Sequence, residues 1–118
     1  MNITEHRFLE LIKSCHLIIK KVEGFSVRLE NYWANNNHYA MFFNFQTGEW
    51  KEYVKIYLES RSKPLSVSVY LFRDKSRDIS VKSFTDYNEL REWLINLAEN
   101  INNFVVKELQ EINKKYES

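Results

Sequence analysis

The chain has very little cysteine, glycine or proline: one, two and one residues among 118. A single cysteine, Cys15, cannot form an internal disulfide, so a hydrophobic core must stabilise the fold. Two glycines, Gly24 and Gly48, cannot build the glycine-rich loops that hold nucleotide phosphates. We therefore expect no nucleotide cofactor, and the turns must be made largely by Asn, Asp, Ser and Lys.

Long apolar runs are also missing. The longest one, Tyr39 to Phe43, is far shorter than the ~18 residues that a membrane-spanning helix needs. The first residues do not form the charged, apolar and small-residue regions of a secretory signal. Together with the single cysteine, this predicts a cytoplasmic protein that does not enter a membrane.

The net charge of +1 is small and unevenly spread. Residues 24–84 carry nine basic and six acidic groups, whereas residues 85–118 carry four basic and seven acidic groups. Nucleic-acid binders concentrate more positive charge than this, because phosphate neutralisation supplies most of their affinity. Binding of DNA or RNA is therefore not the first expectation.

Alternating residues between Phe25 and Phe84 fall into two distinct sets, as expected when strands point successive side chains to opposite sides of a sheet. One set is apolar and predicts a core face: Phe25, Val27, Leu29, Trp33, Tyr39, Met41, Phe43, Phe45, Val54, Ile56, Leu58, Leu65, Val67, Val69, Leu71, Ile79 and Val81. The other set mixes charges with six aromatic residues and includes Lys82 near its end.

Helical periodicity flanks this alternating region on both sides. Residues 3–22 repeat apolar positions at intervals of three and four, which predicts a helix. Asn2 and Glu5 have the spacing of an N-cap and its partner, and Gly24 is expected to end the helix. A second apolar stripe follows Asp86 and Glu89, which are spaced as a capping box, and predicts a helix to about residue 114. The asparagines at 100–103 leave open whether that helix is continuous.

Four short breaks, at 34–37, 46–49, 60–64 and 73–78, separate five strand candidates. Breaks of this length connect antiparallel neighbours and cannot hold a crossover helix. We predict one α+β domain over residues 1–118: an N-terminal helix, a five-stranded antiparallel meander sheet and a long C-terminal helix, with both helices packed on one sheet face.

The common catalytic and metal-binding patterns are not found. His6 and His16 are ten residues apart on the first helix, and neither pairs with His38 at a metal-ligand spacing. Cys15 and His16 are adjacent, and neighbouring helical residues do not face each other, so we interpret Cys15 as a small core residue. We predict no metal site, no cofactor and no catalytic residues, although an enzyme assembled from scattered residues stays open as a third alternative.

The polar set of the sheet region offers the best candidate site. Tyr, Phe and Arg are enriched where proteins bind one another, because they bury a large area and keep a polar group. The same aromatic residues could instead stabilise the sheet by cross-strand pairing, or stack the bases of single-stranded nucleic acid. Our leading hypothesis is an interaction module of the inhibitor, immunity or adaptor type that binds a protein, or itself as a homodimer, through Arg28, Tyr32, Phe42, Tyr53, Lys55, Tyr57, Tyr70 and Phe72. Single-stranded nucleic-acid binding on the same face is the alternative.

Overall fold

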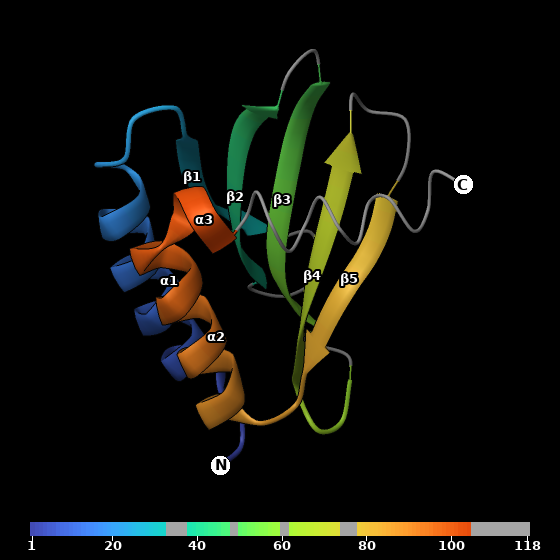
Figure 1. Cartoon of the computed structure of the whole chain (residues 1–118). Coiled ribbons are helices and arrows are strands. Elements are labelled where there is room, and N and C mark those ends of the chain that lie inside the picture. The colour runs from blue at the N-terminus through green and yellow to red at the C-terminus, as the bar shows by residue number, and fades with distance from the viewer. Residues whose placement is uncertain (33–37, 48–49, 60–61, 74–77, 105–118) are drawn as a thin grey trace.

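A computed structural model describes residues 1–32, 38–47, 50–59, 62–73 and 78–104. It confirms the predicted α+β class and the order of helix, five strands and helix (Figure 1). The elements are α1 (Glu5–Ile19), β1 (Ser26–Tyr32), β2 (His38–Thr47), β3 (Trp50–Glu59), β4 (Ser66–Arg73), β5 (Asp78–Phe84), α2 (Tyr87–Glu99) and α3 (Ile101–Phe104).

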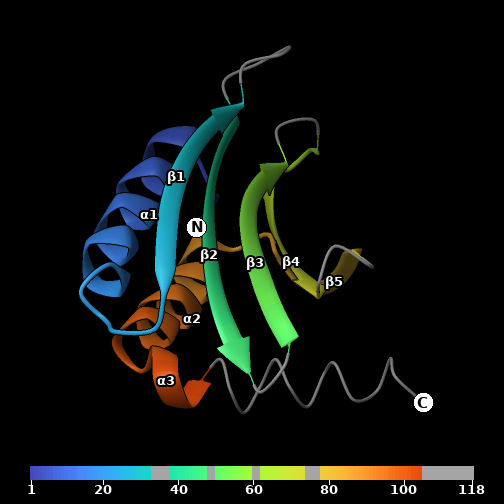
Figure 2. The ribbon, with the colours of Figure 1, turned by 90° about the horizontal axis from the view of Figure 1, so that it is seen from above.

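The five strands form one open antiparallel sheet in the order β1-β2-β3-β4-β5, so each strand pairs with its neighbours in the chain. The strands curve, and α1 and α2 lie on the same side of the sheet (Figure 2). This is the predicted meander, and it follows from short connections between strands with alternating apolar residues.

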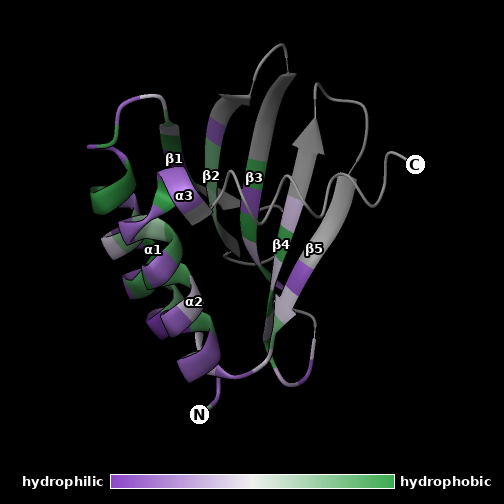
Figure 3. Cartoon of the chain, in the orientation of Figure 1, coloured by the Kyte–Doolittle hydropathy of each residue, from purple (hydrophilic) through white to green (hydrophobic). Residues whose placement is uncertain are grey.

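The core lies between this side of the sheet and the two helices. Met41, Phe43, Val54, Ile56 and Leu58 are fully buried there, as the alternation predicts. Each helix contributes one apolar stripe, and hydrophobic and hydrophilic residues alternate along both (Figure 3). The helix residues in the core are Phe8, Leu11, Ile12, Cys15, Ile19, Leu90, Leu94, Leu97 and Ala98.

The first helix begins later than its sequence suggests. Thr4, not Asn2, is the N-cap of α1, and its hydroxyl accepts a hydrogen bond from the backbone N–H of Arg7 at 3.2 Å. Asn2 instead forms an isolated antiparallel bridge with Asp86. The N-cap prediction was therefore wrong by two residues, because a contact distant in sequence holds Asn2 in an extended conformation. The helix also ends earlier than predicted, at Ile19 with Lys20 as its C-cap. Gly24, at φ 93°, lies beyond that end and does not terminate the helix.

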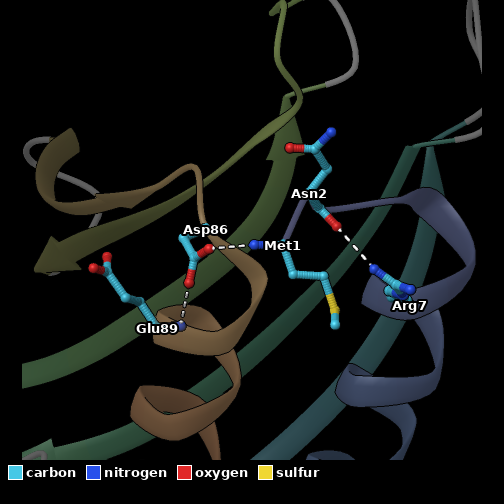
Figure 4. A network of polar contacts seen from close by, with 5 residues as sticks. All are labelled: Met1, Asn2, Arg7, Asp86 and Glu89. Carbon is cyan, nitrogen blue, oxygen red and sulfur yellow. Dashed lines mark hydrogen bonds and ion pairs between the residues drawn. The ribbon is translucent and has the colours of Figure 1, made fainter.

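Asp86 caps α2 as predicted and also anchors the N-terminus. Its carboxylate accepts from the backbone N–H of Glu89 at 3.0 Å and lies 2.8 Å from the Met1 ammonium (Figure 4). The ammonium and the N–H of Glu89 hold the pKa of Asp86 below its usual value. Nearby, the Arg7 guanidinium donates to the carbonyl of Asn2, so the starts of both helices share one polar network.

The C-terminal helix is not the long element that the sequence predicts. α2 ends at Glu99, because Asn100 adopts a non-helical conformation with φ −124° and ψ 36°. The short α3, Ile101–Phe104, follows. The asparagine cluster therefore breaks the helix, and the predicted continuation to residue 114 lies outside the described residues.

A β-bulge changes the alternation in β5. Val69 pairs with Lys82 but the next residue, Tyr70, pairs with Ser80, so Val81 is an extra residue on its strand. Lys82 consequently lies on the helix side, where its ammonium is 5.6 Å from the centre of the Trp93 ring of α2. Strict alternation had assigned Lys82 to the opposite side of the sheet, and the bulge overturns that assignment.

Candidate functional site

The candidate site lies on the side of the sheet opposite α1 and α2, which we call the outward face. Antiparallel pairing places Arg28 of β1 opposite Phe42 of β2, Phe42 opposite Lys55 of β3, and Lys55 opposite Tyr70 of β4. These four residues form a central row that crosses four strands. Directly opposed side chains on one sheet face are close enough to contact each other.

Two cations of this row stack on aromatic rings. The Arg28 guanidinium carbon lies 4.8 Å from the centre of the Phe42 ring, and the Lys55 ammonium lies 5.9 Å from the same ring. The Lys55 ammonium is also 4.5 Å from the centre of the Tyr57 ring. Such contacts contribute about 0.5–1 kcal/mol each at exposed positions. They cover Phe42, which is only 9% exposed, and they hold both positive groups at the surface of the sheet.

Tyr57 projects from between two small residues. Ala40 of β2 and Ser68 of β4 stand directly opposite it on the neighbouring strands. Both are buried although they belong to the outward face, so larger side chains around them cover them. Tyr57 itself is half-buried. Tyr57 therefore stands beside Lys55 on the outward face, two residues further along β3.

A hydrogen bond links the tyrosine at the end of the central row to an acidic group. The hydroxyl of Tyr70 donates to the Glu59 carboxylate at 3.0 Å. Both side chains are half-buried. Among its described side chains, the outward face thus combines two cations, one carboxylate and three aromatic rings within a few strand pairs, which suits a polar and aromatic contact surface.

Five of the eight residues predicted for the site are brought together in this way: Arg28, Phe42, Lys55, Tyr57 and Tyr70. Of the other three, Tyr53 and Phe72 pair with each other in the backbone register of β3 and β4, and Tyr32 pairs with His38 at the end of β1. The side chains of Tyr32, Tyr53 and Phe72 lie outside the described part of the structure.

Alternation could identify which residues share the face but could not show what they contact. The stacking of Arg28 and Lys55 on Phe42 depends on the register between three strands. The hydrogen bond from Tyr70 to Glu59 joins β4 to the end of β3 and depends on register in the same way. Only the spacing of the turns could have indicated those pairings.

Cys15 is a core residue, as predicted. Its side chain is fully buried between the helices, and its Sγ donates to the carbonyl oxygen of Leu94 at 3.7 Å. Burial, assisted by the negative charge of Glu99, raises the pKa of the thiol to about 11. A thiol in this state is a poor nucleophile, because the thiolate is the reactive form.

Among the described residues, His, Cys, Asp and Glu side chains do not gather in groups of three that could hold a metal ion. Within the same ranges, none of the helices combines the length and the apolar character that crossing a bilayer requires.

The chain matches no protein-family model, and no curated protein is significantly similar to it.

Proposed function

We propose that this chain is a small interaction module that binds another protein through the outward face of its sheet. The central row of Arg28, Phe42, Lys55 and Tyr70, which crosses four strands opposite the helices, is the observation that supports this proposal. Arginine, tyrosine and phenylalanine are enriched at protein interfaces. Side chains already stacked on one another also lose less conformational entropy when a partner binds.

The stacking favours a protein partner over single-stranded nucleic acid. A base that stacks on an aromatic ring needs access to the ring face. On this surface Arg28 lies over Phe42, and Lys55 lies between Phe42 and Tyr57. A base would have to displace these cations, whereas a protein partner can contact their charged groups where they lie.

Within this proposal the chain acts by occupying a surface of its partner, as inhibitors, immunity proteins and adaptors do. A cytoplasmic location fits a chain whose single thiol is buried and cannot form an internal disulfide. The carboxylate of Glu59 and the cations Arg28 and Lys55 would fix the orientation of the partner, since charged pairs at an interface contribute mainly to specificity.

The test is affinity capture from the native host with three versions of the chain. The wild type should retain a protein that the double variant Tyr57→Ser/Tyr70→Ser loses, while circular dichroism shows that the variant is folded. Leu17→Ser is the matched control, because Leu17 is 52% exposed on α1, on the other side of the molecule. It should retain the partner.

The ionic strength of the wash separates the two kinds of partner. A protein bound to this face should be retained with only a modest dependence on salt, whereas nucleic acid would be released steeply as salt rises. Retention of the same protein by the tyrosine double variant and the wild type would contradict the proposal. Recovery of nucleic acid with a steep salt dependence would replace it with the alternative function.

A further inference from the structure

The two edges of the sheet differ in how well they could accept another strand. β1 and β5 are the end strands of the sheet. β5 contains the bulge opposite Val69 and Tyr70, and bulges at sheet edges oppose pairing with another chain. β1 instead pairs with β2 residue for residue from Ser26 to Tyr32. The regular edge is therefore β1, and an added strand needs a regular edge.

The helix side of β1 is only partly covered. Val27 and Leu29 are half-buried, whereas the residues opposite them on β2, Phe43 and Met41, are fully buried. α1 contacts both β1 and β2 and leaves Val27 and Leu29 partly exposed. A strand added beside β1 would remove the remaining apolar surface of Val27 and Leu29 from water, which is favourable.

The sequence of β1 is complementary to itself in the reverse direction. If two copies of β1 pair antiparallel about Leu29, position 28 of each copy lies opposite position 30 of the other. Arg28 then faces Glu30 of the second copy, and two-fold symmetry forms this pair twice. Opposite charges at directly opposed positions stabilise antiparallel strands, and like charges destabilise them.

Stacking of Arg28 on Phe42 is compatible with this pairing. A guanidinium stacks through its flat face and donates hydrogen bonds from its edge, so it can contact a ring and a carboxylate together. Leu29, at the symmetry axis, would meet its own copy on the helix side of the joined sheets.

We propose that two copies of this chain associate through β1, antiparallel and in register about Leu29, so that their sheets become continuous. The partner at this edge is therefore a second copy of the chain. The outward faces of both copies would lie side by side in the dimer. The proposal rests on the sheet edge and not on the proposed binding of another protein, and its test uses the purified chain alone.

Charge exchange tests the register. Sedimentation velocity over a concentration series should show self-association of the wild type. Arg28→Glu and Glu30→Arg should each weaken it by about tenfold or more, because two like-charge pairs replace two opposite-charge pairs. The double variant Arg28→Glu/Glu30→Arg restores opposite charges and should recover wild-type association. A wild type that sediments as a monomer at every concentration, or a double variant no better than the single ones, would overturn the proposal.

A cross-linking experiment tests the same register without changing charge. In the proposed dimer Leu29 lies opposite its own copy at a Cα separation that suits a disulfide. Leu29→Cys should therefore give a covalent dimer under mild oxidation, and the buried Cys15 should not take part. Ser26→Cys is the matched control, because position 26 would lie opposite position 32 and should stay monomeric. Equal cross-linking of the two variants, or none of Leu29→Cys, would overturn the register.

Discussion

Alkaline titration provides a direct test of how Cys15 is packed between α1 and α2. The thiol is fully buried, and its pKa is raised from 9.0 to about 11, mainly by burial and further by Glu99. A buried thiolate loses its hydration, so the folded chain holds the thiol proton more tightly than the unfolded chain does. Cys15 therefore couples the stability of the helix pair to alkaline pH.

The sign and size of this coupling follow from the two pKa values. Well below pH 9 the thiol is protonated in both states and its contribution is fully present. As the pH rises from 9.0 toward 11, the unfolded chain ionises first and the free energy of unfolding falls. The pKa difference corresponds to a loss of about 2–3 kcal/mol at most.

Urea denaturation followed by circular dichroism, at a series of pH values, measures this loss. Cys15→Ala is the matched variant: it should be less stable at neutral pH, because removal of Sγ leaves a cavity, but its stability should fall less in alkali. The two proteins differ only at residue 15, so the difference between the two curves isolates the thiol. Curves that run parallel to high pH would refute the reasoning.

The rate of thiol labelling gives an independent measurement on the same residue. With a pKa near 11 instead of 9.0, the thiolate fraction at neutral pH is about a hundredfold lower than for an ordinary cysteine. Burial also blocks the reagent, so the folded chain should react at least about a hundredfold more slowly than the urea-unfolded chain. Equal rates in the two states would show that Cys15 is not enclosed by the helices.

Three other changes have defined expectations. Asp86→Ala should lower the melting temperature at neutral pH and reduce the loss of stability as the pH falls below 3.8. The reason is that Asp86, whose folded pKa is lowered, stabilises the fold only while it is ionised. Identical acid melting curves of the two proteins would contradict this. Gly24→Ala should lower the free energy of unfolding in urea by about 1 kcal/mol, because φ is 93° at this residue. A β-carbon there meets nothing within 4 Å, so the loss is purely conformational. An unchanged stability would contradict that reasoning. Phe42→Ala should lower the free energy of unfolding by about 3 kcal/mol in the same assay, because the ring is only 9% exposed and two cations stack on it. A loss as small as that of an exposed residue would contradict the stacked arrangement.

The sheet and its core face could be predicted because the apolar period is regular over most of the strands. Residues such as Val54, Ile56 and Val67 alternate with polar neighbours, and a one-residue slip would expose all of them. The short breaks between strands then fix the antiparallel order. The cap at Asp86 was predictable too, since Glu89 is three residues away and the contact is local.

The features that the sequence did not predict depend on contacts distant in the chain. Asn2 and Thr4 are both acceptable N-caps, and the bridge from Asn2 to Asp86 decides between them. The bulge at Val81 leaves no mark in composition, and it reverses the side on which Lys82 lies. The end of α2 was ambiguous, because the apolar stripe continues past Asn100 while the asparagines oppose a helix.

The candidate site was predicted at the level of its face. The alternation grouped Arg28, Phe42 and Lys55 together, but it suggested an aromatic ring open to a partner. The structure shows that ring beneath two cations. The difference arises because a side chain's neighbours on a sheet come from other strands, and their register is not encoded in the local pattern.

The order of elements has a consequence for synthesis on the ribosome. Each strand pairs with the strand made just before it, so the sheet can assemble hairpin by hairpin as the chain emerges. α1 is translated before any strand and α2 after all five, yet the two helices pack on each other and the residues before α1 bridge to Asp86. The part of the α1 stripe that packs on α2 therefore stays uncovered until all five strands and α2 have been made, and a nascent chain stalled before α2 would present that part to chaperones.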